Sequence, residues 1–319
     1  MIWRRSREAA DKVEAVPPAN EPSAIDATDP SDRLDLPPSE RCLFIIGAAR
    51  SGTTVLQNAL NDSPDIFLFG EPDFHSDPGA PGFAERYNAM HRSWANQETK
   101  STFCPAVLPV DGAWNDYLRQ MGGHHRYIGS KIVINPVRER DALSRLFDFQ
   151  SRNFYRAKHV FTFRRPLPTV MSTRDLQLLV QGRSDELRVI LTNYAETACL
   201  YLRMLRNLPH VQAVFHEHVD RNTFDGLERW LDLPLAQAHR YYDTSKVRRY
   251  DAMDPSLAYA DVLAALDRLY DELRQEAARE FRALQAEQND NHLSDTHFTA
   301  VGRLHRELSA IVRTLAAEG

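Results

Sequence analysis

The 319-residue sequence predicts an α/β fold, with a central parallel sheet flanked by helices and a helical C-terminal extension. Three observations predict this class. Short continuous apolar runs, typical of strands buried on both faces, alternate with segments whose apolar residues recur at helical spacing. The first apolar run passes through a glycine-containing turn directly into such a helical segment. Beyond residue 256, only helical patterns follow.

The stretch from Arg41 to Thr54, RCLFIIGAARSGTT, is the centre of the predicted sheet. Its apolar run, residues 42–46, predicts a strand, and the spacing of apolar residues over 55–60 predicts a helix. Small residues form the turn between them, so its backbone N–H groups can approach a ligand closely. Because a helix N-terminus also carries the positive end of the helix dipole, we expect this turn to bind a phosphate.

The turn fits most of the P-loop pattern, in which a glycine, four residues and a second glycine precede a lysine and a serine or threonine. Gly47, Gly52 and Thr54 occupy their positions, but Thr53 stands where the lysine is expected. That lysine reaches the β- and γ-phosphates of a triphosphate. Its absence predicts a nucleotide phosphate that is not a triphosphate. Arg50 brings a cation into the turn three positions earlier.

The other elements follow in order along the chain. Further strands are expected at residues 66–69, 126–135, 159–163 and from residue 211. Helices are expected at residues 113–121, 136–152, 167–173, 184–207, 224–231, 235–241, 257–288 and 298–315. Ligands of open parallel sheets bind beyond the carboxyl ends of the strands. Glu71 and His75, just after the second strand, are therefore expected on the same edge as the turn. Lys131, in the third strand, either points a cation into the cleft or is an ordinary exposed residue.

The chain is expected to divide into three parts. Residues 1–38, rich in Pro, Ala, Asp, Glu and Ser, predict a disordered or loosely packed arm. Residues 39–255 predict the α/β domain, within which residues 76–112 form an irregular insertion suited to ligand recognition. Residues 256–319 predict the helical extension, whose apolar stripes pack on the domain or on a second copy of the chain.

Composition excludes several classes of partner. A net charge of −5 makes nucleic acid an unsuitable partner by charge alone. The three cysteines, Cys42, Cys104 and Cys199, are odd in number and far apart, so they predict reduced core residues and no disulfide frame or metal cluster. No run reaches the roughly 18 apolar residues of a membrane span, and the N-terminus has no apolar core of a signal peptide. These features favour the cytoplasm.

The motif RSGTT after an apolar strand resembles the 5′-phosphosulfate loop of the sulfotransferases that use PAPS (3′-phosphoadenosine 5′-phosphosulfate), whose fold is similar to that of P-loop NTPases. A second motif supports the resemblance. In that family an arginine at a strand end and a serine eight residues later bind the 3′-phosphate, and Arg164 and Ser172 have this spacing, with Pro166 two residues after the arginine. Arg165 departs from the family, which often has an acid there. Independently of the family, an arginine fork suits a dianionic phosphate.

The resemblance implies in-line transfer of a sulfuryl group from PAPS to an acceptor hydroxyl or amine, without a metal because PAPS has no triphosphate to clamp. Arg164 and Ser172 would bind the 3′-phosphate. The 5′-phosphosulfate would be held by Arg50 and by the backbone N–H groups of Ser51, Gly52, Thr53 and Thr54. The hydroxyls of the two threonines could add further hydrogen bonds. The acceptor is left open: a carbohydrate, a lipid, a small phenol or alcohol, or a peptide tyrosine.

The resemblance also offers candidates for catalysis. Glu71 is the first choice for the base that takes the acceptor proton, since some sulfotransferases use a glutamate just after the second strand. His75 is the rival, because other members use histidine, which titrates near neutral pH. Lys131 is a further catalytic candidate from its place in the third strand, not from the resemblance. Glu217 resembles an acidic position of the family, but we expect a solvated charge at the strand end.

Three further possibilities are left open. Arg248 or Arg249, in a basic loop, would reach the 3′-phosphate or serve as surface charge. A P-loop kinase or NTPase would share the turn, but Thr53 and the lack of a clear Mg²⁺-binding acid argue against it. A non-enzymatic nucleotide-binding or scaffold protein would keep the turn but need neither Glu71 nor the Arg164–Ser172 pair.

Overall fold

The computed structural model describes residues 39–70, 124–136, 141–235, 238–242, 259–284 and 295–317, all of which belong to one unit of the chain, Leu34–Gly319. Several predictions lie outside the described residues: the arm at 1–38, the insertion at 76–112, the helix at 113–121, and the residues Glu71, His75, Cys104, Arg248 and Arg249.

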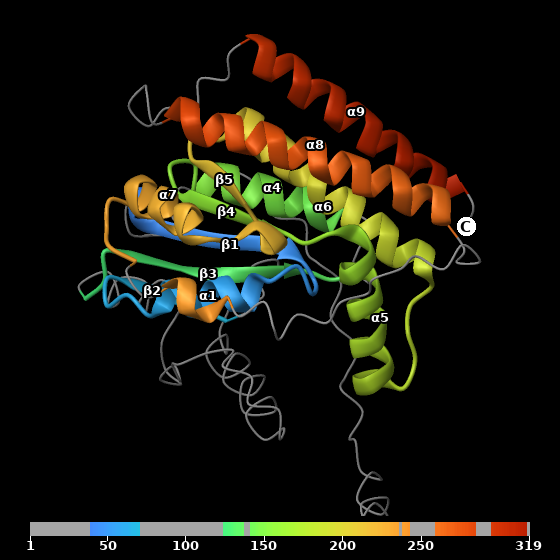
Figure 1. Ribbon diagram of the computed structural model, residues 1–319, viewed down its shortest axis with the longest axis horizontal. Coiled ribbons are helices and arrows are strands. Elements are labelled where there is room, and N and C mark those ends of the chain that lie inside the picture. The colour runs from blue at the N-terminus through green and yellow to red at the C-terminus, as the bar shows by residue number, and fades with distance from the viewer. Residues whose placement is uncertain are drawn as a thin grey trace, which may run out of the picture. The chain divides into compact units, whose positions relative to one another are not determined.

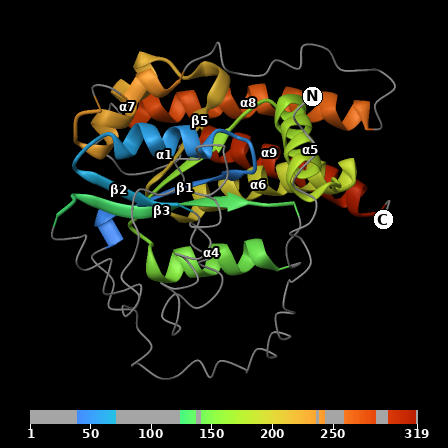
Figure 2. The same cartoon turned by 90° about the horizontal axis from the view of Figure 1, so that it is seen from below.

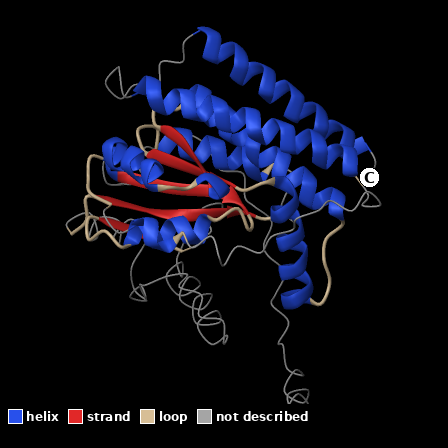
Figure 3. Ribbon diagram, viewed as in Figure 1, coloured by secondary structure: helices blue, strands red, loops and turns tan. Residues whose placement is uncertain are grey.

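Five parallel strands form one sheet, which confirms the predicted parallel sheet, and their order is β2-β3-β1-β4-β5 (Figure 3). The strands are β1 (Cys42–Ala48), β2 (Ile66–Phe69), β3 (Tyr127–Ile134), β4 (Lys158–Phe163) and β5 (Val211–Phe215). β1 lies in the centre and every one of its residues is buried, which confirms the prediction of a strand covered on both faces. The chain adds β2 and β3 on one side of β1 and then β4 and β5 on the other. The direction of winding therefore changes next to β1, which is where parallel sheets bind ligands.

The helices of the described residues are α1 (Thr53–Asn61), α4 (Ala142–Asn153), α5 (Pro166–Gln181), α6 (Leu187–Asn207), α7 (Arg221–Leu231), α8 (Ala260–Leu284) and α9 (Asp295–Ala317). Short 3-10 helices are η2 (Ser39–Arg41), η3 (His216–His218) and η4 (Ala238–Tyr241). The expected start of a helix at Pro136 is wrong. Pro136 lies in a bend, and α4 begins only after Asp141, whose carboxylate binds Arg145 in the first turn.

Helices cover both faces of the sheet (Figures 1 and 2). Alternate residues of β1 face opposite ways, so Phe44 and Ile46 join one apolar cluster while Leu43 and Ile45 join the other. The first cluster includes residues of α4, α6, α8 and α9, and the second includes residues of α1, α7 and η4. Since α8 contacts α5 and β5, and α9 contacts α6 and α8, the C-terminal helices pack on the α/β domain. Their predicted association with a second copy stays a prediction.

Two details bear on the compositional predictions. Cys42 and Cys199 are free thiols, and burial raises the pKa of Cys42 to about 12, so Cys42 is the reduced core residue that was predicted. Among the described helices, none has both the length and the apolar character that crossing a membrane requires.

Candidate functional site

The turn after β1 folds back tightly on the strand it leaves. Ser51 Oγ lies 2.8 Å from Thr162 Oγ1 of β4, and both side chains are buried. A Cβ on Gly47 would come within 2.5 Å of each of these oxygens, a distance that Cβ atoms do not tolerate. Gly47 is therefore required because two hydroxyls occupy the space above the strand. Thr162 was missed from the sequence, although a threonine near the end of an apolar strand is the signal for it.

Two residues of the turn have left-handed backbones. Gly52, the N-cap of α1, has φ 100°, and Arg50 has φ 67°. For a non-glycine residue this conformation costs about 1–2 kcal/mol, so it persists only where surrounding contacts impose it. Arg50 Nε donates a hydrogen bond of 3.0 Å to Ser172 Oγ, and Thr173 Oγ1 donates one of 3.2 Å to the carbonyl of Ala49. Helix α5 thus holds the turn in shape.

The Arg50–Ser172 hydrogen bond joins the two predicted phosphate motifs, which are 122 positions apart in the sequence. Arg164, at the end of β4, and Ser172, on α5, are both buried, with 7% and 6% of their surfaces exposed. The structure therefore brings Arg50, Arg164 and Ser172 to the carboxyl edge of the sheet, next to the N-terminus of α1. Two basic side chains, one hydroxyl and a helix N-terminus suit an anion there.

Lys131 is fully buried, and its Nζ donates a hydrogen bond of 3.0 Å to Thr54 Oγ1. The interpretation of Lys131 as an ordinary exposed strand residue is wrong. β3 pairs directly with β1, so a long side chain on β3 reaches the first turn of α1 beneath the loop. The ammonium group thus lies at the start of α1, next to the position where a P-loop has its lysine.

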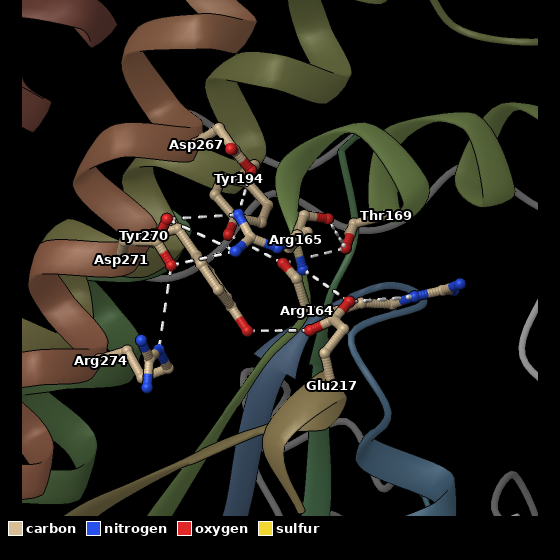
Figure 4. A network of polar contacts seen from close by, with 9 residues as sticks. All are labelled: Arg164, Arg165, Thr169, Tyr194, Glu217, Asp267, Tyr270, Asp271 and Arg274. Atoms are coloured by element: carbon tan, nitrogen blue, oxygen red, sulfur yellow. Dashed lines mark hydrogen bonds and ion pairs between the residues drawn. The ribbon is translucent and has the colours of Figure 1, made fainter. Parts of the chain in front are cut away.

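Glu217, in η3, is not the solvated charge that was expected, since its side chain is only 24% exposed (Figure 4). Its Oε1 accepts a hydrogen bond of 3.0 Å from the backbone N–H of Arg165 and lies 3.8 Å from Nε of Arg164. Its Oε2 accepts one of 2.8 Å from the hydroxyl of Tyr270 on α8. Pattern analysis failed here because the partner comes from a helix 53 positions further along the chain.

Arg165, which departs from the family pattern, binds residues of α8. Its guanidinium donates hydrogen bonds of 2.8 Å to Asp267 and 3.1 Å to Asp271, and its Cζ lies 5.1 Å from the centre of the Tyr270 ring. The guanidinium groups of Arg164 and Arg165 therefore have different partners, although Glu217 contacts both residues.

His216 is a site residue that sequence reasoning missed. A Cβ on Gly52 would lie only 2.8 Å from His216 Nδ1, so the ring packs against the N-cap of α1. Burial lowers the pKa of His216, Glu217 opposes the shift, and the Arg164 guanidinium adds to it. The ring is therefore neutral at pH 7. Its buried Nδ1 has no hydrogen-bond partner in the described part of the chain. The centroid of the His216 ring lies 5.6 Å from that of the Tyr242 ring.

Two of the predicted catalytic residues, Glu71 and His75, follow β2 outside the described residues, so their positions stay predictions. Within the described ranges, no group of three or more His, Cys, Asp or Glu side chains is arranged to hold a metal ion.

Residues 42–219 match the sequence profile of the Sulfotransferase family. The chain belongs to this family. The matched region contains the turn, Lys131, Arg164, Ser172 and Glu217 and ends just before α7, so η4, α8 and α9 of this sulfotransferase-family protein lie beyond it.

Two solved structures similar to this family member are sulfotransferases. One is the sulfotransferase from Alicyclobacillus acidocaldarius, with 18% sequence identity, a TM-score of 0.39, and coverage of 77% of this chain and 96% of that one. The other is mouse sulfotransferase SULT7A1 complexed with PAP, with 12% identity, a TM-score of 0.40, and coverage of 80% and 91%. A search of curated proteins gives no match.

Proposed function

We propose that this protein transfers a sulfuryl group from PAPS to an acceptor hydroxyl or amine. One observation carries the proposal: the hydrogen bond from Arg50 to Ser172 unites the turn after β1 with the Arg164–Ser172 motif. A nucleotide with anionic groups at both its 5′ and 3′ positions has a use for both motifs. A nucleotide with a single phosphate cluster would need only the first.

The residues present fit such a nucleotide. Backbone N–H groups at the start of α1, with Arg50, would hold the 5′-phosphosulfate. Neither Gly47 nor Gly52 has a side chain of its own, and neighbouring side chains pack closely against both residues and hold the turn in shape. Arg164 and Ser172 would hold the 3′-phosphate, where a charged donor and a neutral hydroxyl suit a dianion. PAPS, when bound, supplies the sulfuryl group, and its 5′-phosphate is the leaving group.

The protein's own residues would then have three tasks. The positive end of α1 and the buried ammonium of Lys131 stabilise negative charge that develops beside the loop. The rigid turn and α5 fix the donor's orientation. Glu71 accepts the acceptor proton, with His75 as the rival base, and the acceptor is a small molecule, a carbohydrate or a lipid.

Lys131 affects the choice between sulfuryl transfer and the kinase or NTPase alternative. Because its ammonium reaches Thr54, the threonine at position 53 no longer argues strongly against a triphosphate. Sulfuryl transfer is favoured instead by the second motif at Arg164 and Ser172 and by membership of the family.

The experiment is a screen of acceptors with ³⁵S-labelled PAPS, with the 3′,5′-bisphosphate product as a competing inhibitor. Label transferred to at least one acceptor, and suppressed by the bisphosphate, supports the proposal. A protein that ignores PAPS and the bisphosphate but binds ATP–Mg²⁺ with micromolar affinity refutes it in favour of the kinase or NTPase.

A further inference from the structure

Helix α8 lies beyond the family-matched region, yet it contacts Arg165 and Glu217, the neighbours of Arg164 (Figure 4). Three neighbouring residues of α8 make these contacts: Asp267, Tyr270 and Asp271. They lie on one side of the helix, since positions three and four apart share a face. The contacts form two chains of polar interactions, one through Arg165 and one through Glu217.

The first chain fixes the side chain next to Arg164. The guanidinium of Arg165 binds two carboxylates: Nη1 donates to Asp267 at 2.8 Å and also to Asp271 at 3.5 Å, and Nη2 donates to Asp271 at 3.1 Å. These side chains are between 34% and 49% exposed, so solvent screens the ion pairs and their main effect is on geometry. The guanidinium is bound by two carboxylates and lies over the Tyr270 ring, and these contacts restrict its orientation. The backbone N–H of Arg165 is held separately, by Glu217.

The second chain reaches the guanidinium of Arg164 itself. Burial, and then the charge of Glu217, raises the pKa of Tyr270, so its hydroxyl stays protonated and donates to Glu217 Oε2. The other oxygen, Oε1, binds the Arg165 N–H and faces Nε of Arg164 at 3.8 Å. Because Tyr270 fixes one end of the carboxylate, the other end is held where it can orient Arg164. A hydrogen bond of 2.9 Å from Tyr194 fixes the carbonyl of Arg164.

We propose that Asp267, Tyr270 and Asp271 of α8 are positioning residues that orient Arg164 for the 3′-phosphate of the nucleotide. The inference rests on the proposed function, in which Arg164 binds that phosphate. It gives the C-terminal extension a part in nucleotide selectivity, in addition to its contribution to the core.

A purely electrostatic effect would have the opposite sign. Asp267 and Asp271 are negative, so their removal raises the positive potential near Arg164 and would strengthen attraction for a dianionic phosphate. Loss of orientation would weaken it. The direction of the change therefore separates positioning from charge, and a role in stability alone would leave the selectivity unchanged.

The test is calorimetric titration of the full-length protein with adenosine 3′,5′-bisphosphate and with adenosine 5′-monophosphate. The ratio of the two dissociation constants isolates the 3′-phosphate. In the double variant Asp267→Ala/Asp271→Ala we expect the preference for the bisphosphate to fall by about tenfold, since orientation of a charged hydrogen-bond donor is lost. Affinity for the monophosphate should be unchanged.

The matched control is Glu272→Ala/Glu307→Ala, which also removes two carboxylates. These bind Arg268 and Arg303 between α8 and α9, and no contact given for the described residues joins them to Arg165. The control should keep the wild-type ratio. If the first double variant does not fold, Tyr270→Phe decides: it removes one hydroxyl, retains the ring packed on Phe215 at 5.3 Å between ring centroids, and should also lower the ratio.

The outcomes separate the two proposals. A wild-type protein that binds both nucleotides equally overturns the 3′-phosphate site and with it the proposed function. The positioning inference is overturned if Asp267→Ala/Asp271→Ala, or Tyr270→Phe in its place, retains or increases the wild-type preference. It is also overturned if the control variant loses the preference to the same extent. Either result leaves the proposed function standing.

Discussion

Arg50 and Lys131 are two basic side chains that lie in the turn after β1 or contact the helix that follows it, although Thr53 stands where a P-loop has its lysine. Arg50 has a left-handed backbone and binds Ser172, whereas Lys131 enters from the neighbouring strand and binds Thr54. The importance of Arg50 could be predicted, because it lies within the motif. Lys131 was a candidate for the cleft from its strand alone, but its contact with Thr54 could not be predicted, because the contact depends on the β1–β3 pairing and on the length of one side chain.

Replacing Lys131 with methionine should lower kcat by roughly 10²-fold or more, since a charged group preorganised beside developing negative charge contributes about that much. Methionine has a similar length and no charge, so the fold should tolerate it better than alanine. Steady-state kinetics with PAPS, together with urea unfolding, checks the prediction. An unchanged kcat in a folded variant would remove Lys131 from the catalytic machinery.

The variant Glu71→Gln should abolish turnover while nucleotide binding survives, because glutamine keeps the shape of the side chain and cannot accept a proton. His75→Gln is the comparison. Full activity in Glu71→Gln, with loss in His75→Gln, would transfer the role of base to the histidine. Turnover and calorimetric nucleotide affinity are measured on the same preparations.

Among the larger elements, the strands were the most predictable, since short, mostly apolar segments between polar turns indicate buried strands. β2 was predicted with the observed bounds. Less could be said where tertiary contacts decide. The start of α4 was misplaced at Pro136, and Glu217 was assigned to solvent because its partner on α8 has no local signature. The contact of Arg165 with Asp267 of α8 had no local signature either.

The contact between α4 and β4 predicts a dependence of stability on pH. His159 of β4 is fully buried against Gln150 of α4, with Nε2 3.0 Å from Oε1, and burial lowers its pKa from the ordinary 6.5 to about 3. The folded state thus keeps the ring neutral, while the unfolded chain takes up a proton below pH 6.5. Stability is therefore retained above pH 6.5 and lost as the pH falls toward 3.

Between pH 7.5 and pH 5, this one group should lower the free energy of unfolding by about 2 kcal/mol. Urea unfolding at the two pH values checks the figure. His159→Gln retains hydrogen-bonding capacity and does not titrate, so its loss over the same interval should be smaller by that amount. An identical pH dependence in the variant would mean that other groups account for it.

In the whole molecule, the site depends on segments far apart in the chain. The turn after β1, the end of β4, α5 and η3 meet because the direction of winding changes next to β1, and α8 joins them from beyond the matched region. Parallel-sheet topology predicted the common edge. The contribution of α8 could not be predicted, because an amphipathic pattern shows which face of a helix is buried and not which element buries it.

The central claim is that Arg164 and Ser172 form a site for a 3′-phosphate beside the turn. Calorimetric titration with adenosine 3′,5′-bisphosphate and adenosine 5′-monophosphate tests it most directly. The account predicts that wild-type protein prefers the bisphosphate, and that Arg164→Ala reduces this preference roughly 10- to 100-fold through loss of a charged hydrogen bond while the monophosphate is hardly affected. Ser172→Ala should act in the same direction, with a further effect through Arg50. Equal weakening of both ligands by Arg164→Ala, or no preference in the wild type, would contradict it.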